Sequence, residues 1–234
     1  MGGSLSLKGI NKSYGNLQVL RDFNLEVSSA EKIVLLGASG VGKTTFLKII
    51  AGLEAPSSGQ IIISAKRIGM VFQEPRLIPW RTVRQNMLFV NPNGDVESIL
   101  FNLRLKDFAE YYPNQLSGGM QQRVNLGRAL IVSPDLLILD EAFGSLDMPV
   151  KMSIIKDMMA QWSKKKCTII AVTHDLKEAL YIADRILIIG SEPAVIKHDF
   201  KVELGPERNF FDPELLLLES RLLQIMQTIE NYVG

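Results

Sequence analysis

A glycine-rich loop, GASGVGKTT at residues 37–45, is the feature that most constrains the fold of this chain. It follows the apolar run KIVLL and precedes the helical run FLKIIAG, so a buried strand should lead into it and a helix should leave it. Glycines let successive backbone N–H groups point into one concavity, and the helix N-terminus adds partial positive charge. The loop therefore predicts a polyphosphate site, which comprises Gly37, Ala38, Ser39, Gly40, Val41, Gly42, Lys43, Thr44 and Thr45.

Side chains in and near this loop indicate phosphoryl-transfer chemistry. Lys43 would neutralise the β and γ phosphates, and Thr44 would bind Mg²⁺ through its hydroxyl group. A second apolar strand, LLILDE, ends in Asp140 and Glu141. Because successive side chains of a strand point to opposite sides, these carboxylates cannot do the same job. One can face Mg²⁺ while the other meets an attacking water molecule.

The order of apolar and helical runs predicts an α/β fold. Three short apolar runs, each followed by a helical pattern, have the βαβ rhythm of a parallel sheet. Residues 4–15, 18–28 and, more loosely, 59–72 alternate apolar and polar side chains and predict an antiparallel sheet beside it. Residues 80–133 read as a helical insertion. A last helix should begin after Asp212, with Pro213 at its first position.

Composition narrows the classes of function. The 234 residues are 47% hydrophobic and 22% charged, which is ordinary for a folded soluble protein. A net charge of +1 argues against electrostatic binding to nucleic acid. The apolar runs are too short for a membrane span, and the first residues do not read as a secretory signal. Cys167 is interpreted as a small core side chain and His198 as a surface residue.

Six motifs together resemble a known family. In chain order they are GASGVGKT, VFQE with Gln73, LSGGMQQR, LLILDE, GSLD with Asp147 and VTHD with His174. This series, over roughly residues 5–200, resembles the nucleotide-binding subunits of ABC transporters. QEPRLIPWRTV and DPELLLLESRLLQIM are most similar to ATPase subunits of nitrate, sulfonate and taurine importers. This chain departs from the family pattern in two ways. The stretches on either side of Gln73 are short, and Ala142 stands where many relatives carry proline.

The resemblance implies a P-loop NTPase (RecA-like) fold with a mostly parallel core, an antiparallel β subdomain and a helical insertion. Residues 1–234 would form one domain, with a nucleotide-binding core at 1–79 and 134–200, a helical subdomain at 80–133 and a C-terminal extension at 201–234. It also implies that the nucleotide lies between two copies of the chain, so that each copy contributes to both sites.

Residue roles follow from the same resemblance. Tyr14 would stack on adenine, although a lone tyrosine is otherwise more often a core or surface residue. Gln73 would touch Mg²⁺ or the water, and His174 would contact the γ-phosphate, where the plainer interpretation is a structural histidine. Asp147 would lie at the contact between two subunits. The catalytic residues would be Glu141, His174, Lys43 and Gln73. The Mg²⁺ ligands would be Thr44, Gln73 and Asp140. The γ-phosphate held by the other subunit would be bound by Ser117, Gly118 and Gly119.

The sequence therefore predicts the ATPase subunit of an importer, which binds Mg-ATP between two head-to-tail copies or pairs with a related ATPase. Its partners would be membrane permease subunits and, indirectly, a solute-binding protein, at the cytoplasmic face of the membrane and without nucleic acid. Two alternatives stay open: a soluble ABC ATPase that is not coupled to transport, and a scaffold that binds nucleotide without hydrolysing it.

Overall fold

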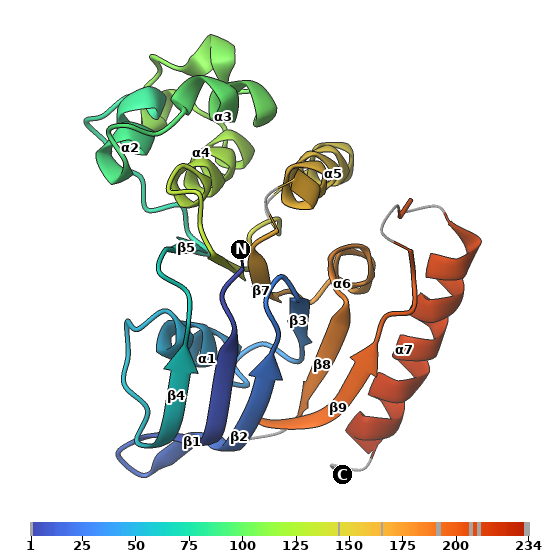
Figure 1. The fold of residues 1–234 in the computed structure, drawn as a ribbon. Coiled ribbons are helices and arrows are strands. Elements are labelled where there is room, and N and C mark those ends of the chain that lie inside the picture. Colours follow the sequence, from blue (N-terminus) through green and yellow to red (C-terminus); the bar gives the residue numbers. More distant parts are fainter. Residues whose placement is uncertain are drawn as a thin grey trace.

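A six-stranded sheet lies at the centre of the computed structural model, which describes residues 2–144, 146–164, 166–190, 193–205, 208–209 and 212–231. The strand order is β5-β6-β7-β3-β8-β9, and every neighbouring pair is parallel except β8 and β9 (Figure 1). The strands are β3 (Lys32–Leu36), β5 (Ile68–Val71), β6 (Leu136–Asp140), β7 (Thr168–Val172), β8 (Arg185–Gly190) and β9 (Val195–Lys201). The carboxyl ends of β5, β6, β7 and β3 therefore meet at one edge, where open α/β sheets bind ligands.

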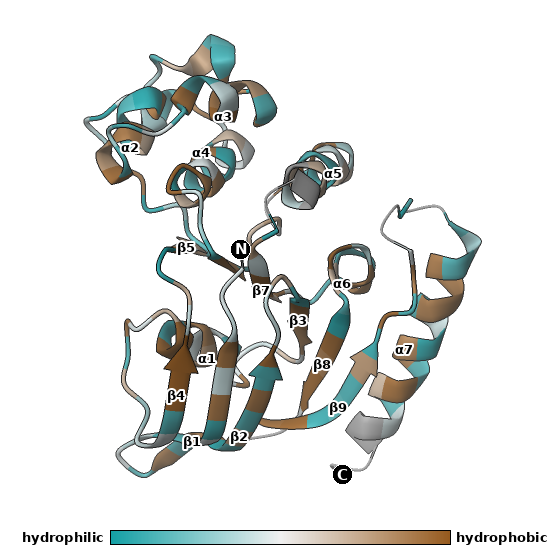
Figure 2. Ribbon diagram, viewed as in Figure 1, coloured by the Kyte–Doolittle hydropathy of each residue, from teal (hydrophilic) through white to brown (hydrophobic). Residues whose placement is uncertain are grey.

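The central strands are apolar throughout because both faces of the sheet are covered. Every residue of β3, β6 and β7 is buried, and Figure 2 shows hydrophobic colour over much of the visible strand β8 beside them. Along β3, Val34 and Leu36 face one apolar cluster, while Ile33 and Leu35 face the other. Helix α1 (Lys43–Ile50) covers the second cluster, and α5 (Met148–Lys164) and α6 (Leu176–Ile182) cover the first.

A smaller antiparallel sheet is formed by β1 (Leu5–Tyr14), β2 (Leu17–Val27) and β4 (Ser58–Ile63) in the order β2-β1-β4. The prediction that residues 59–72 lie wholly in this sheet is wrong. Only β4 pairs with β1, whereas β5 pairs in parallel with β6 of the large sheet. The chain changes sheets at residues 64–67, and β5 packs against a helix of the insertion while its side chains still alternate between half-buried and buried.

The helical insertion lies above the edge of the sheet in Figure 1. It contains α2 (Val83–Val90), α3 (Val96–Asn102), the 3₁₀ turns η1 (Lys106–Phe108) and η2 (Pro113–Gln115), and α4 (Gly118–Leu130). Thr82 begins α2 with a capping box, since its side chain accepts from Gln85 N and the Gln85 side chain accepts from Thr82 N. The predicted P-loop fold, with its antiparallel sheet and helical insertion, is confirmed.

The last described helix is α7 (Pro213–Asn231), which packs on α6. The Asp212 carboxylate accepts from Glu214 N at 3.3 Å, as expected for a residue that starts the helix. His198 is exposed on β9, as predicted, and Cys167 is only partly buried before β7. None of the helices within the described ranges is long and apolar enough to cross a bilayer.

Candidate active site

The glycine-rich loop joins β3 to α1 in a conformation that requires glycine. Gly40 has φ of 82° and Gly42 has φ of 110°, both in the left-handed region. A Cβ atom on Gly42 would also lie 2.8 Å from Val19 Cγ1. Gly42 is the N-cap of α1, and no side chain among the described residues caps that helix. The first N–H groups of α1 can therefore bind an anion.

Lys43 lies inside this loop with its ammonium group turned toward the loop backbone. Nζ donates to Gly37 O at 2.8 Å and to Ala38 O at 2.7 Å, and the residue is 6% exposed. Burial lowers the pKa of Lys43, while the charges of Glu141 and Asp140 oppose the shift. An incoming phosphate would offer this ammonium group an anionic partner in place of neutral carbonyl oxygens.

The side-chain oxygens of Thr44 and Asp140 are in contact next to the glycine-rich loop. The Thr44 hydroxyl donates to Asp140 Oδ1 at 3.2 Å, which connects the start of α1 to the end of β6. Asp140 is 4% exposed, and burial raises its pKa, although the bond from Thr44 opposes the shift. A cation near both oxygens would stabilise the ionised form of this carboxyl group.

Glu141 connects three neighbouring strands. Its φ of 46° is unusual for a residue other than glycine, and its N–H donates to Val172 O at 3.0 Å. Its Oε2 lies 3.4 Å from Gln73 Nε2 and 3.5 Å from His174 Nδ1. Because Gln73, Glu141 and His174 follow β5, β6 and β7, the sheet order brings together these three of the four predicted catalytic side chains.

Tyr14 ends β1 and reaches α1 from the small sheet. Its hydroxyl donates to the Glu54 carboxylate and contacts the Thr45 side chain. Lys12 Nζ lies 4.8 Å from the centre of the tyrosine ring and 2.9 Å from Glu54 Oε1. The hydrogen bond to Glu54, with burial, raises the pKa of Tyr14. The ring is thus held beside the glycine-rich loop while its side chain is half exposed.

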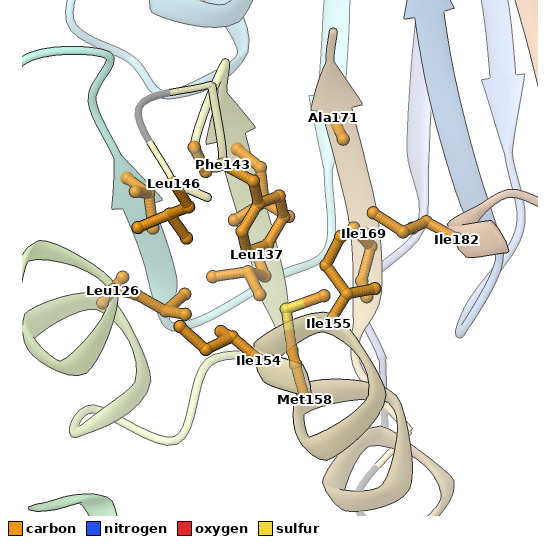
Figure 3. Packing of buried hydrophobic residues seen from close by; sticks show 14 of the residues in the cluster. Leu126, Leu137, Phe143, Leu146, Ile154, Ile155, Met158, Ile169, Ala171 and Ile182 are labelled. Carbon is orange, nitrogen blue, oxygen red and sulfur yellow. The ribbon is translucent and has the colours of Figure 1, made fainter. Parts of the chain in front are cut away.

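The segment Ser117–Gly119 begins α4. Ser117 Oγ accepts from Met120 N at 3.3 Å, and a Cβ on Gly118 would meet nothing within 4 Å. A Cβ on Gly119 would lie 3.2 Å from Leu146 Cδ2, so this segment contacts the residue before Asp147. Figure 3 shows Leu146 in one apolar cluster with Leu126 of α4. Figure 1 shows α4 among the helices of the insertion and α1 beside the small sheet.

Asp147 is exposed, and its backbone oxygen accepts from Lys151 N at 2.8 Å. Its carboxylate therefore faces solvent at the start of α5. The structure thus places the predicted residues Lys43, Thr44, Gln73, Asp140, Glu141 and His174 at one edge of the sheet, with Tyr14 against Thr45. Gly119 instead lies against Leu146, the residue before Asp147.

A comparison with protein families decides the assignment. The model of a family described as ABC transporter matches residues 20–144, which is more than half of the chain. The chain belongs to the ABC transporter family. The family that the six motifs resemble is confirmed, and with it the predicted class of ATPase.

Individual ABC proteins are similar over most of this cassette. The aliphatic sulfonates import ATP-binding protein SsuB 2 of Pseudomonas syringae pv. tomato is 41% identical over 91% of this chain and 93% of its own length. SsuB of Bacillus licheniformis is 37% identical over 98% and 96%. Among solved structures, the dimeric post-hydrolysis state of the ATP-binding cassette MJ0796 bound to ADP and Pi is 29% identical, with a TM-score of 0.76, over 86% of this chain and 100% of that chain.

Two groups of polar residues in this ABC cassette were not predicted from the sequence. Gln122 and Asn125 of α4 donate to Phe72 O, one residue before Gln73. Lys151 Nζ lies 2.9 Å from Asp175 Oδ2 and 3.5 Å from Glu178 Oε2. Asp175 is the residue that follows His174. Two amides spaced by three residues on a largely buried helix were the available signal, but the sequence did not show which face of the helix meets β5.

Proposed function

We propose that this ABC cassette hydrolyses ATP between two copies of itself and drives an importer for aliphatic sulfonates or similar anions. The observation that carries the proposal is the contact of Glu141 with both Gln73 and His174, beside a glycine-rich loop that holds a buried lysine. Phosphoryl transfer needs positioning and charge compensation more than covalent chemistry. This group of side chains is suited to supply both.

Each side chain has one role in the proposed reaction. Lys43 and the first N–H groups of α1 bind the β and γ phosphates. Glu141 orients and polarises the attacking water, and His174 contacts the γ-phosphate as negative charge shifts there. Gln73 lies beside Glu141 and orients the same water. The left-handed backbone of Glu141 supports this proposal, because strain of this kind is concentrated at functional sites.

The donor set fits a magnesium ion that arrives with the nucleotide. Thr44 Oγ1 and Asp140 Oδ1 lie 3.2 Å apart, and the Gln73 side chain adds a carbonyl oxygen. Mg²⁺ prefers such hard oxygen ligands together with substrate phosphates and water. Within the described ranges, no three His, Cys, Asp or Glu residues cluster as a protein-only metal site. When bound, Mg²⁺ would neutralise charge on the phosphate oxygens.

A second copy completes the proposed site. Ser117, Gly118 and Gly119 begin a 13-residue helix with small residues, and Figure 1 shows this helix α4 apart from α1, the helix that follows the glycine-rich loop. A helix N-terminus of this kind suits the γ-phosphate of the partner's nucleotide. The solved cassette MJ0796 with ADP and Pi is described as dimeric, which supports a pair of copies here. Asp147 would lie at their contact.

The proposed permease contact is the helical insertion. Trp80, Phe89 and Phe101 expose large apolar side chains in or next to this insertion, at 76%, 56% and 70% exposure. They support docking of membrane subunits against this insertion, with the cassette at the cytoplasmic face of the membrane and a solute-binding protein on the other side. The names of the relatives, which import aliphatic sulfonates, support the class of solute.

Glu141→Gln tests the proposal. We expect ATP binding to be kept and ATP hydrolysis to fall by roughly a thousandfold, because the water loses its polarising carboxylate while the phosphate contacts stay. Nucleotide binding is measured by equilibrium dialysis and hydrolysis by phosphate release. With the permease subunits that co-purify from membranes, reconstituted vesicles of wild-type protein should take up an aliphatic sulfonate, and vesicles of the variant should not.

Glu74→Gln is the matched control, since Glu74 is an exposed carboxylate one residue after Gln73. It should keep both hydrolysis and uptake. Hydrolysis that continues at the wild-type rate in Glu141→Gln would remove Glu141 from the mechanism. Hydrolysis without uptake of any sulfonate would refute the class of solute and leave the ATPase assignment intact.

A further inference from the structure

Two buried amide side chains of α4 hold the carbonyl group that precedes Gln73. Asn125 Nδ2 donates to Phe72 O at 2.8 Å, and Gln122 Nε2 donates to the same oxygen at 3.2 Å. Asn125 Nδ2 also lies 3.4 Å from Gln122 Oε1, so the two amides support each other. They are 3% and 1% exposed. The carbonyl oxygen has a donor for each of its two lone pairs, which fixes this peptide against α4.

Close packing prevents α4 from sliding along β5. A Cβ on Gly69 of β5 would lie 2.5 Å from Ala129 O of α4, so the two backbones are in contact. Farther along, Arg128 Nη1 donates to Arg76 O at 2.9 Å. The helix therefore holds the end of β5 and the segment after it at three successive points. A displacement of α4 must move Gln73 with it.

The same helix begins at Ser117, the proposed contact with the partner's nucleotide. Gln122 follows Ser117 by five residues, which is just over one helical turn. From Gln122 the contacts lead to Phe72 O, then to Gln73, and from Gln73 Nε2 to Glu141 Oε2 at 3.4 Å. One short path of direct contacts thus joins the surface for the partner's γ-phosphate to the carboxylate of the chain's own site.

We propose that Gln122 and Asn125 are positioning residues that set Gln73 and Glu141 according to whether α4 has bound the partner's nucleotide. The inference rests on the proposed two-copy function and assigns the coupling between its two sites. Neither residue touches nucleotide. They act through the Phe72 carbonyl, so they should affect turnover and the order of the residue 72–76 segment rather than binding of ATP to one copy.

Asn125→Leu and Gln122→Met test the inference, because each removes one donor and keeps a similar volume. We expect kcat for ATP hydrolysis to fall about tenfold or more, since misplacing a catalytic group by about 1 Å can cost a hundredfold. The Kd of a single copy for ATP should not change. Asn91→Leu is the control: it makes the same substitution at an amide that donates to Ile131 O, at the far end of α4.

Two further measurements separate positioning from a general loss of stability. In a Gln73→Ala background, Asn125→Leu should have no additional effect on kcat, because its effect passes through Gln73. Hydrogen exchange of residues 72–76 should become faster in Asn125→Leu and stay unchanged in Asn91→Leu. If Asn125→Leu does not fold, Asn125→Ala serves in the same cycle, since it removes the donor without adding a larger apolar side chain.

Wild-type kcat in the folded variants, equal losses in Asn91→Leu, or additive losses in the double variant would each overturn the inference. A failure of the proposed function would give different results. The wild-type protein itself would then not hydrolyse ATP, or Glu141→Gln would not form an ATP-dependent dimer.

Discussion

Glu178 is a buried carboxyl group four residues after His174 in the chain. It is 2% exposed, and burial raises its pKa to about 7, although Lys151 at 3.5 Å opposes the shift. Its neighbours do not titrate near neutral pH, because the pKa of Lys151 is raised and that of Asp175 is lowered by their mutual hydrogen bond, in both cases against the effect of burial. Glu178 is therefore the one member of this group that changes charge near neutral pH.

Stability should depend on pH through Glu178. Its pKa rises from 4.5 in the unfolded chain to about 7 in the folded one, so the folded chain binds more protons between these values. The free energy of unfolding then falls as pH rises from 5 to 8, by up to about 3 kcal/mol. Glu178→Gln should lack this fall and be relatively more stable at pH 8. Urea denaturation at four pH values measures it, and a difference independent of pH would contradict it.

The chemistry-bearing residues could be predicted individually because their signals are local. The glycine loop and the two adjacent carboxylates each lie within a few residues of their own flanking apolar run. The contact of Gln73 and His174 with Glu141 depends on the strand order β5-β6-β7, which no local pattern contains. The same holds for Gln122 and Asn125, whose function depends on which face of α4 meets β5.

The packing of β5 against α4 is sensitive to the addition of a single methyl group. Gly69→Ala would place Cβ 2.5 Å from Ala129 O, so a backbone must shift. We expect the free energy of unfolding to fall by about 2 kcal/mol, as for overpacked cores. Gly205→Ala, where a Cβ meets nothing within 4 Å, should change it little. Urea denaturation compares the two, and equal effects would show that β5 and α4 can separate freely.

The misassigned segment shows why β5 was difficult to predict. Residues 59–72 form one continuous run of β-prone residues, but β4 is an exposed strand of the small sheet and β5 is a half-buried strand of the large one. The change of sheet occurs at residues 64–67, where Arg67 Nη2 lies 3.3 Å from Asp135 Oδ1. That long-range ion pair belongs to the folded chain and leaves no local pattern in the sequence.

Assembly of the whole molecule should be tested at Gly118. Because a Cβ there meets nothing within 4 Å, Gly118→Trp should leave a single copy folded and able to bind ATP. In the two-copy arrangement the indole would occupy the place of the partner's γ-phosphate. We expect the double variant Gly118→Trp, Glu141→Gln to stay monomeric with Mg-ATP. The single variant Glu141→Gln should form dimers under the same conditions. Light scattering after size exclusion measures this.

Gly205→Trp provides the control for an added indole at an equally open glycine, and it should leave the dimer intact. A dimer that persists in the Gly118 variant would refute the contact in trans. A monomer that has lost its affinity for ATP would instead place Gly118 in the nucleotide site of its own chain.

The position of β3 in the middle of the large sheet has a consequence for how the chain is made. Residue 32 pairs with residue 169, and residue 33 pairs with residue 185. The strand that leads into the phosphate loop is therefore synthesised long before either of its neighbours exists. Contacts so distant in sequence form slowly, and an apolar strand with both edges unpaired is prone to aggregate meanwhile. Nascent chains that stop before β7 would expose this strand, so its protection during translation is a requirement for producing the protein in soluble form.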